Sequence, residues 1–95
     1  MDRRAYSILA VAVLLALGAV GCGKDPEVAK REYVQSGDKY FDEGKFSEAI
    51  IEYRNAVQQD PRFGEARSKL AESFLQAGDL VNAYQQYVQL GRAHV

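Results

Sequence analysis

The sequence predicts an all-α fold: two tandem helix-turn-helix hairpins, a fragment of an α-solenoid, preceded by an apolar N-terminal signal helix. Three observations support this prediction. No charged residue occurs from position 5 to position 23, whereas the rest of the chain is markedly polar. The polar part matches itself at an offset of 34 residues, a period typical of repeats built from helical hairpins. A glycine, Gly44 or Gly78, separates the two predicted helices of each hairpin.

The N-terminal segment has the pattern of a secretory signal peptide. Arg3 and Arg4 precede an apolar stretch, and small residues follow it. The small residues before Cys22, beginning at Ala19, resemble the lipobox of bacterial lipoproteins, although leucine is more usual than alanine at that first position. The resemblance implies that residues 1–21 are cleaved off and that Cys22 is lipidated. An uncleaved inner-membrane anchor is the alternative, because 19 uncharged residues can just span a bilayer core of about 30 Å.

Both interpretations put the remainder outside the cytoplasm, because Arg3 and Arg4 favour the inner side of the membrane. The lipoprotein resemblance implies that residues 22–29 are the lipidated cysteine and a tether. Gly23 stands where an acidic residue would retain such a lipoprotein in the inner membrane. We therefore expect the outer membrane, with the protein facing the periplasm.

The first helix is predicted to begin at Pro26, with Asp25 as its N-cap, because proline suits the first helical position. Gly44 can adopt the left-handed conformation that ends such a helix. Apolar and small residues recur in between at spacings of three and four, which marks one helical face. These residues are Tyr33, Gly37, Tyr40 and Phe41.

The second helix is predicted to be capped by Ser47 and to end at Asp60-Pro61, because proline cannot continue a helix. Its apolar face comprises Ala49, Ile50, Tyr53, Ala56 and Val57. The same order then recurs from Gly64: a helix, Gly78 and a fourth helix. The pairs that match at the 34-residue offset are Tyr40 with Phe74, Gly44 with Gly78, Phe46 with Leu80, Ala49 with Ala83 and Tyr53 with Tyr87.

These positions resemble the tetratricopeptide repeat (TPR). Its succession of aromatic, small and proline positions is matched by Tyr33, Gly37, Tyr40, Gly44, Ala49, Tyr53, Ala56 and Pro61. The resemblance implies one repeat over residues 30–63 and a second over residues 64–95. The second repeat is incomplete or divergent at its end, because the match fades after Tyr87 and His94-Val95 replaces the expected Asp-Pro pair.

Composition argues against catalysis and nucleic-acid binding. The chain has 12 basic and 13 acidic residues, which cannot form a concentrated basic surface. His94 is the only histidine, so neither a Ser-His-Asp arrangement nor a His-rich metal site can form. No glycine-rich phosphate loop follows a strand. We therefore expect no enzyme, no cofactor and no metal.

The TPR resemblance implies a concave groove, lined by the first helix of each repeat, that holds a peptide or a partner helix. Its expected residues are Arg31, Val34, Asp38, Phe41 and Asp42 from the first repeat, and Glu65, Ser68, Glu72, Leu75 and Gln76 from the second. Phe41 and Leu75 are the best partner contacts, unless they pack on each other or cover the core. The groove is acidic, which predicts a neutral or basic partner.

The leading functional hypothesis is a lipid-anchored scaffold of the bacterial envelope. Lipoproteins of this kind are associated with the assembly of outer-membrane proteins, pili or exopolysaccharide export machinery. The alternative is the N-terminal anchor and TPR segment of a longer protein whose downstream domain is catalytic. A third expectation is self-association through the uncapped final helix, where Tyr84, Tyr87, Val88 and Leu90 would lack a covering helix.

Overall fold

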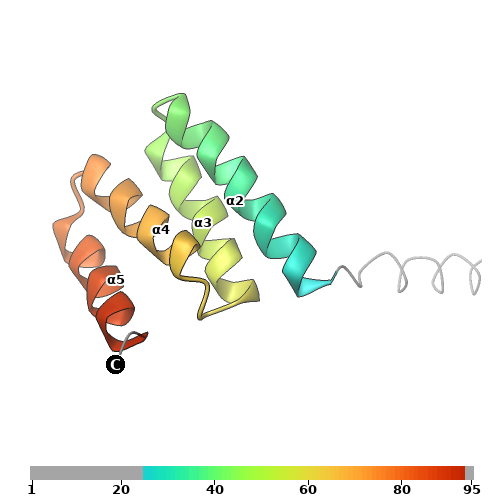
Figure 1. Cartoon of the computed structure of the whole chain (residues 1–95). Coiled ribbons are helices and arrows are strands. Elements are labelled where there is room, and N and C mark those ends of the chain that lie inside the picture. The colour runs from blue at the N-terminus through green and yellow to red at the C-terminus, as the bar shows by residue number, and fades with distance from the viewer. Residues whose placement is uncertain (1–24, 94–95) are drawn as a thin grey trace, which may run out of the picture.

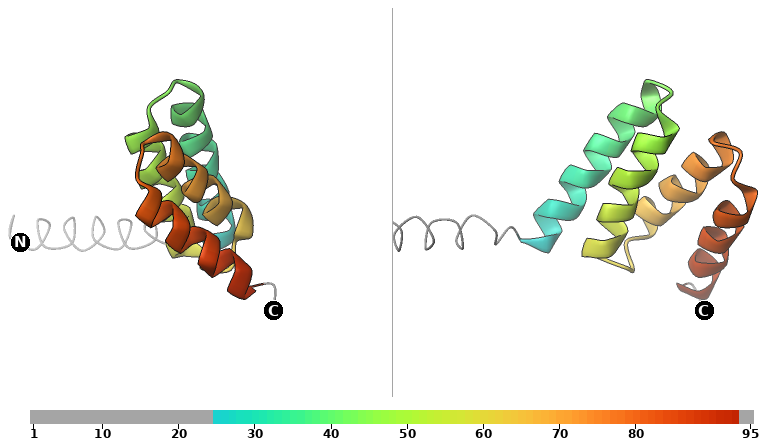
Figure 2. Two further views of the ribbon diagram at one scale, coloured as in Figure 1. Left: turned by 90° about the vertical axis from the view of Figure 1, so that its left-hand side faces the viewer. Right: turned by 180° about the vertical axis from the view of Figure 1, so that it is seen from behind.

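The computed structural model describes residues 25–93, and this part of the chain consists of four helices without a strand. Their bounds are α2 (Pro26–Asp42), α3 (Phe46–Gln59), α4 (Gly64–Gln76) and α5 (Leu80–Ala93). The helices lie side by side in chain order, each antiparallel to the one before it (Figures 1 and 2). The two predicted helical hairpins are therefore confirmed. The expected signal helix and Cys22 lie outside the described residues.

The start of α2 follows from its cap. The Asp25 side chain accepts a hydrogen bond of 3.0 Å from the backbone N–H of Glu27, and Pro26 is the first helical residue. The expected tether is therefore too long at its C-terminal end. Residues 26–29 belong to the helix because the Asp25-Pro26 start signal lies upstream of them and because Ala29 buries its side chain.

Both hairpin turns use the predicted glycine. Gly44 has a φ of 75° and Gly78 a φ of 81°, a conformation in which a side chain would be strained. The residue after each glycine then donates its N–H to the last turn of the preceding helix, from Lys45 to Tyr40 at 2.9 Å and from Asp79 to Phe74 at 2.8 Å. These are Schellman motifs, and they end α2 and α4.

The two turns differ in how they start the next helix. The predicted cap at Ser47 is wrong, because α3 begins at Phe46 with Lys45 as N-cap and without a side-chain cap bond. The backbone C=O of Lys45 already accepts from the N–H of Ala49 at 3.0 Å, which leaves Ser47 inside the first turn. In contrast, Asp79 accepts from the N–H of Asn82 at 3.1 Å at the start of α5.

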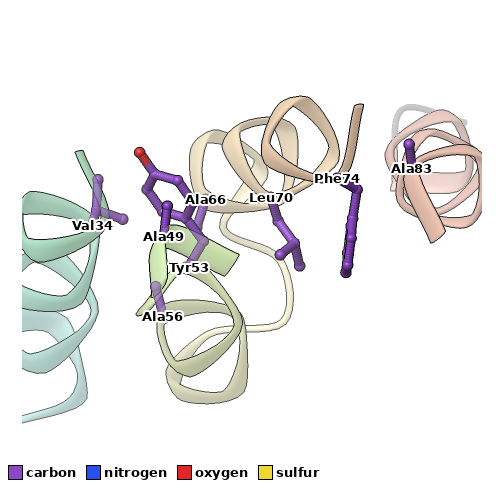
Figure 3. Packing of buried hydrophobic residues seen from close by; sticks show 8 residues of the cluster. All are labelled: Val34, Ala49, Tyr53, Ala56, Ala66, Leu70, Phe74 and Ala83. Atoms are coloured by element: carbon purple, nitrogen blue, oxygen red, sulfur yellow. The ribbon is translucent and has the colours of Figure 1, made fainter. Parts of the chain in front are cut away.

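The core depends on small residues that let helices approach closely, as Figure 3 shows. Ala49, Ala56 and Ala66 have no exposed surface. A Cβ added at Gly37 would lie 2.5 Å from Cε1 of Tyr53, so the Tyr53 ring fills the space that the glycine leaves. Tyr53 thus lies between α2 and α4 and is 1% exposed.

A buried lysine fastens the start of α2 to the end of α3. The Lys30 Nζ lies 2.7 Å from Oδ2 of Asp60 and 2.9 Å from Oε1 of Glu27, and 4.5 Å from the centre of the Phe63 ring. The pKa of Lys30 is raised mainly by its hydrogen bond to Asp60 and, to a smaller extent, by its hydrogen bond to Glu27. The same bond, with the backbone N–H of Arg62, lowers the pKa of Asp60. We call this arrangement the Lys30 clasp.

Candidate functional site

A groove runs between α2 and α4. It consists of a hollow of about 310 Å³ and another of about 170 Å³, which share Asp38. The larger is lined by Asp38, Phe41, Asp42, Tyr53, Lys69 and Glu72. The smaller is lined by Arg31, Val34, Gln35, Asp38, Phe63 and Glu65. We call the two hollows together the α2–α4 groove.

Asp38 is the centre of the groove and connects three helices. The Tyr53 hydroxyl of α3 donates to Oδ1 of Asp38 at 2.5 Å. The Lys69 Nζ of α4 donates to both Asp38 oxygens at 2.8 Å. Lys69 also lies 3.6 Å from Oε1 of Glu65, one helical turn away. The Asp38 carboxylate is therefore already bound by Tyr53 and Lys69 of the same chain. These bonds hold the two repeats together across the groove.

The electrostatics of this network fix its charge state. Partial burial lowers the pKa of Lys69, but its hydrogen bonds to Asp38 and the charges of Asp38 and Glu65 outweigh that effect, so the pKa is raised. The pKa of Tyr53 is raised mainly by burial and, to a smaller extent, by the hydrogen bond to Asp38. Lys69 is therefore a cation and Tyr53 a neutral phenol at pH 7.

The structure brings seven of the ten expected groove residues together around the two hollows. These are Arg31, Val34, Asp38, Phe41, Asp42, Glu65 and Glu72. Val34 is 6% exposed and belongs to the core, so it forms the floor of the groove. Ser68, Leu75 and Gln76 are exposed on α4 but do not line either hollow.

The two apolar candidates have different surroundings. Phe41 is half-buried and packs edge-to-face on Phe46 of α3, with ring centres 5.1 Å apart. Phe41 thus covers the core, the alternative role considered for it, and it also lines the groove. Leu75 is 43% exposed. Leu75 therefore has apolar surface available on α4, beside the groove.

Sequence analysis missed Lys69. Lys69 follows Glu65 by four residues and precedes Glu72 by three, a spacing that places all three on one helical face. This local signal could have located the lysine, but its bond to Asp38, 31 positions away, has no local signal. The groove is consequently less acidic than expected. Asp42 and Glu72 are the lining carboxylates that form no ion pair within the part of the chain described.

The chemistry available in the groove is recognition by charge and shape. Across residues 25–93, no cluster of three or more His, Cys, Asp or Glu side chains could hold a metal ion. None of the helices in that range is long and apolar enough to cross a membrane. The groove offers carboxylates, the Phe41 ring and the exposed amide of Gln35.

One protein-family model matches part of the chain. Residues 37–78 match the family model described as TPR repeat, a range that contains the whole of α3 and α4. The match supports a TPR protein. Such repeats are typically non-catalytic modules that bind other proteins, so the match also supports an interaction role. No curated protein and no solved structure matched the chain.

Proposed function

We propose that this chain is an envelope-anchored TPR lipoprotein, a protein–protein interaction scaffold whose α2–α4 groove holds a segment of a partner. The observation that carries the proposal is the pair Asp42 and Glu72. These carboxylates come from different repeats, line the same hollow and form no ion pair within residues 25–93.

The charge balance of the groove indicates what the partner presents. Lys69 is neutralised by Asp38 and Glu65, so it contributes little net attraction for an acidic ligand. Asp42 and Glu72 leave negative charge at the mouth of the larger hollow. A lysine or arginine of the partner can pair with them, and its aliphatic stem can lie on the edge of Phe41. The partner segment is therefore neutral or basic.

The anchor is the other half of the proposal. Its support is the lipobox resemblance at Cys22, which lies outside the described residues. Because α2 begins at Pro26, only residues 23–25 separate the lipidated cysteine from this helix. The groove would then lie close to the periplasmic face of the outer membrane. The assembly of outer-membrane proteins, pili or exopolysaccharide export machinery is the setting that we propose. An uncleaved inner-membrane anchor is the competing topology.

Site-specific photo-crosslinking in intact envelopes tests the groove. A photoreactive residue at Gln35, inside the groove, should give a discrete cross-linked band that the same residue at exposed Gln58 of α3 does not. The double variant Asp42→Lys and Glu72→Lys should abolish the band. The matched control Glu48→Lys, on the exposed surface of α3, should keep it. Equal bands from Gln35 and Gln58, or a band unaffected by the double variant, would contradict the proposal.

Metabolic labelling with a fatty acid tests the anchor. Wild-type protein should incorporate the label, whereas Cys22→Ser should lose it and accumulate as a precursor in the membrane fraction. Label that persists in Cys22→Ser would exclude Cys22 as the acceptor.

A further inference from the structure

A second hollow, of about 590 Å³, lies between the first turn of α4 and the last turns of α5. Three arginines line it, Arg62, Arg67 and Arg92, together with neutral residues that include Gly64 and Leu90. None of the described residues that line it is acidic. Its volume lies within the range of about 300–1,000 Å³ that is typical of small-molecule sites. We call it the arginine hollow, and it shares no lining residue with the α2–α4 groove.

The second hairpin has space here because it lacks the side chain that forms the clasp in the first. At the 34-residue offset, Gly64 corresponds to Lys30 and Arg67 to Tyr33. The Lys30 side chain is buried at the start of α2, whereas Gly64 leaves the start of α4 bare. A Cβ at Gly64 would lie 3.8 Å from Cδ2 of Leu90, an ordinary contact distance. The hollow is therefore open where the first hairpin is filled.

Arg67 is held in place at the hollow by neutral acceptors. Its Nη1 donates to Oε1 of Gln86 at 3.0 Å, and its Nη2 donates to the backbone C=O of Pro61 at 2.8 Å. These two bonds fix the guanidinium between α5 and the loop before α4. They use two of its five N–H donors and do not neutralise its charge.

The positive charge of the hollow is not balanced by nearby carboxylates. The other two arginines are exposed, and none of the three forms an ion pair within residues 25–93. The acidic residues nearest to the hollow in the sequence are Asp60 and Glu65. Asp60 is bound by Lys30 at 2.7 Å, and Glu65 lies 3.6 Å from Lys69. The arginine hollow is therefore a site for an anion.

A phosphate group suits three guanidinium groups, because each planar fork can donate two parallel hydrogen bonds to phosphate oxygens. The position of the hollow indicates where the phosphate comes from. The loop between α3 and α4 and the end of α5 lie at the same end of the helical array as the start of α2 (Figures 1 and 2). A lipid on Cys22, three residues before α2 and its cap, brings this end to the surface of the bilayer.

We propose that the arginine hollow binds the phosphate of an anionic lipid headgroup in the membrane to which the chain is anchored. This inference rests on the anchor half of the proposed function. Arg67 presents a fixed guanidinium, and Arg62 and Arg92 reach the phosphate from the loop and from α5. A single lipid anchor leaves the array free to turn about its tether. A second contact with the membrane fixes its orientation, and with it the direction in which the α2–α4 groove faces.

Side-chain NMR of the full chain with Cys22→Ser, in neutral detergent micelles, tests the site. Added phosphatidylglycerol should shift the Nε–H resonances of Arg62, Arg67 and Arg92 along one saturable curve, whereas that of exposed Arg54 on α3 should not follow it. Diacylglycerol, which lacks the phosphate, should shift none of them. Inorganic phosphate without lipid should need at least a ten-fold higher concentration. Equal responses to the two phosphates would overturn the lipid as the ligand, and unshifted arginines would overturn the site.

A pair of charge-matched variants in the same micelles tests the role of the arginines. Arg62→Glu with Arg92→Glu should weaken the affinity for phosphatidylglycerol, read at Arg67, at least ten-fold. Lys39→Glu with Lys45→Glu, at the opposite end of the array, should leave it unchanged. Equal weakening by both pairs would overturn the hollow in favour of general charge attraction. An acidic peptide that displaces the lipid at an equal concentration would overturn it in favour of a protein partner.

Failure of this inference and failure of the anchor are distinguishable. The micelle titration uses Cys22→Ser and therefore does not depend on acylation. Fatty-acid labelling of Cys22 in the variant Arg62→Glu with Arg92→Glu should equal that of the wild type, because the hollow is not part of the lipobox. Labelled Cys22 with unshifted arginines would overturn the hollow alone.

Discussion

The second helix of each hairpin, α3 and α5, carries the same repeat positions, but the two helices are buried very differently. Ala49 of α3 and its counterpart Ala83 of α5 are both buried. Tyr53 is 1% exposed, whereas its counterpart Tyr87 is 45% exposed. The alanines are buried in either hairpin, while the tyrosine is buried only in α3, which lies between two other helices (Figure 3).

This difference separates two kinds of repeat residue. The alanine position is satisfied within each hairpin. The tyrosine position is satisfied only when another helix follows, because Tyr53 needs α2 on one side and α4 on the other. In a solenoid, stability comes partly from each repeat and partly from the contact with its neighbour. Comparing the two tyrosines measures the neighbour contribution directly.

The largest effect is expected from truncating the two tyrosines. Tyr53→Ala should destabilise the chain by about 3–5 kcal/mol, because it opens a cavity between three helices. Tyr87→Ala should cost about 1 kcal/mol or less at concentrations where the chain is monomeric, because the site is already open to water. Urea unfolding followed by circular dichroism measures both. Equal losses would mean that Tyr87 is covered in solution even in the monomer.

A pair of glycine substitutions should give the next largest effect. Gly37→Ala should destabilise by about 1–3 kcal/mol, because its new Cβ would collide with the Tyr53 ring. Gly91→Ala should stabilise by up to about 1 kcal/mol, because alanine is the better helix former and the site has space. Thermal melts provide the measurement. A Gly37→Ala protein as stable as wild type would show that the helix crossing is looser than described.

The third comparison concerns Asp38 and its repeat counterpart Glu72. Asp38→Ala should cost about 1–2 kcal/mol, because it removes the acceptor of the buried Tyr53 hydroxyl and the partner of Lys69. Glu72→Ala should change stability by less than about 0.5 kcal/mol, because Glu72 is exposed and unpaired among the described residues. Denaturant midpoints compare the two. If the order is reversed, Asp38 does not organise the groove.

The smallest effect concerns alkaline pH and comes from Tyr53 of α3 and Lys69 of α4. The pKa values of Tyr53 and Lys69 are both raised in the folded chain. Their stabilisation is therefore complete below the unfolded pKa values, near 10, and is lost as pH rises above them. Ionisation of Tyr53 in the unfolded chain should lower the free energy of unfolding by about 0.8 kcal/mol at pH 10.5. Tyr53→Phe should flatten the decline between pH 9 and 10.5, and an unchanged slope would contradict this assignment.

The turns were predictable because their signals are local. Gly44 and Gly78 occupy left-handed positions, and prolines mark the start of α2 and the end of α3. Residue preference alone predicts Ser47 as the cap, but the turn at Gly44 fixes the start of α3 earlier in the chain. Residue preference thus predicts that a helix forms here, but it does not predict which residue begins the helix.

The long-range polar contacts could not be predicted from the sequence. Lys69 reaches Asp38 across 31 positions and Lys30 reaches Asp60 across 30, and no spacing rule links residues so far apart. Val34 was expected in the groove and lines it, but its burial depends on how closely α2 approaches the core. The groove walls were therefore predictable from helix faces, whereas the ion pairs that set its charge required the structure.

The Lys30 clasp makes one end of the helical array more resistant to unfolding than the other. Helix ends ordinarily fray first, yet the first turns of α2 are fastened to the far end of α3 by Asp60 and to the loop by Phe63. The outer face of α5 has no such fastening in a single copy. Amide hydrogens should therefore exchange soonest in α5 and latest where α2 meets α3. Unfolding of the four helices should therefore begin at α5 and reach the contact between α2 and α3 last.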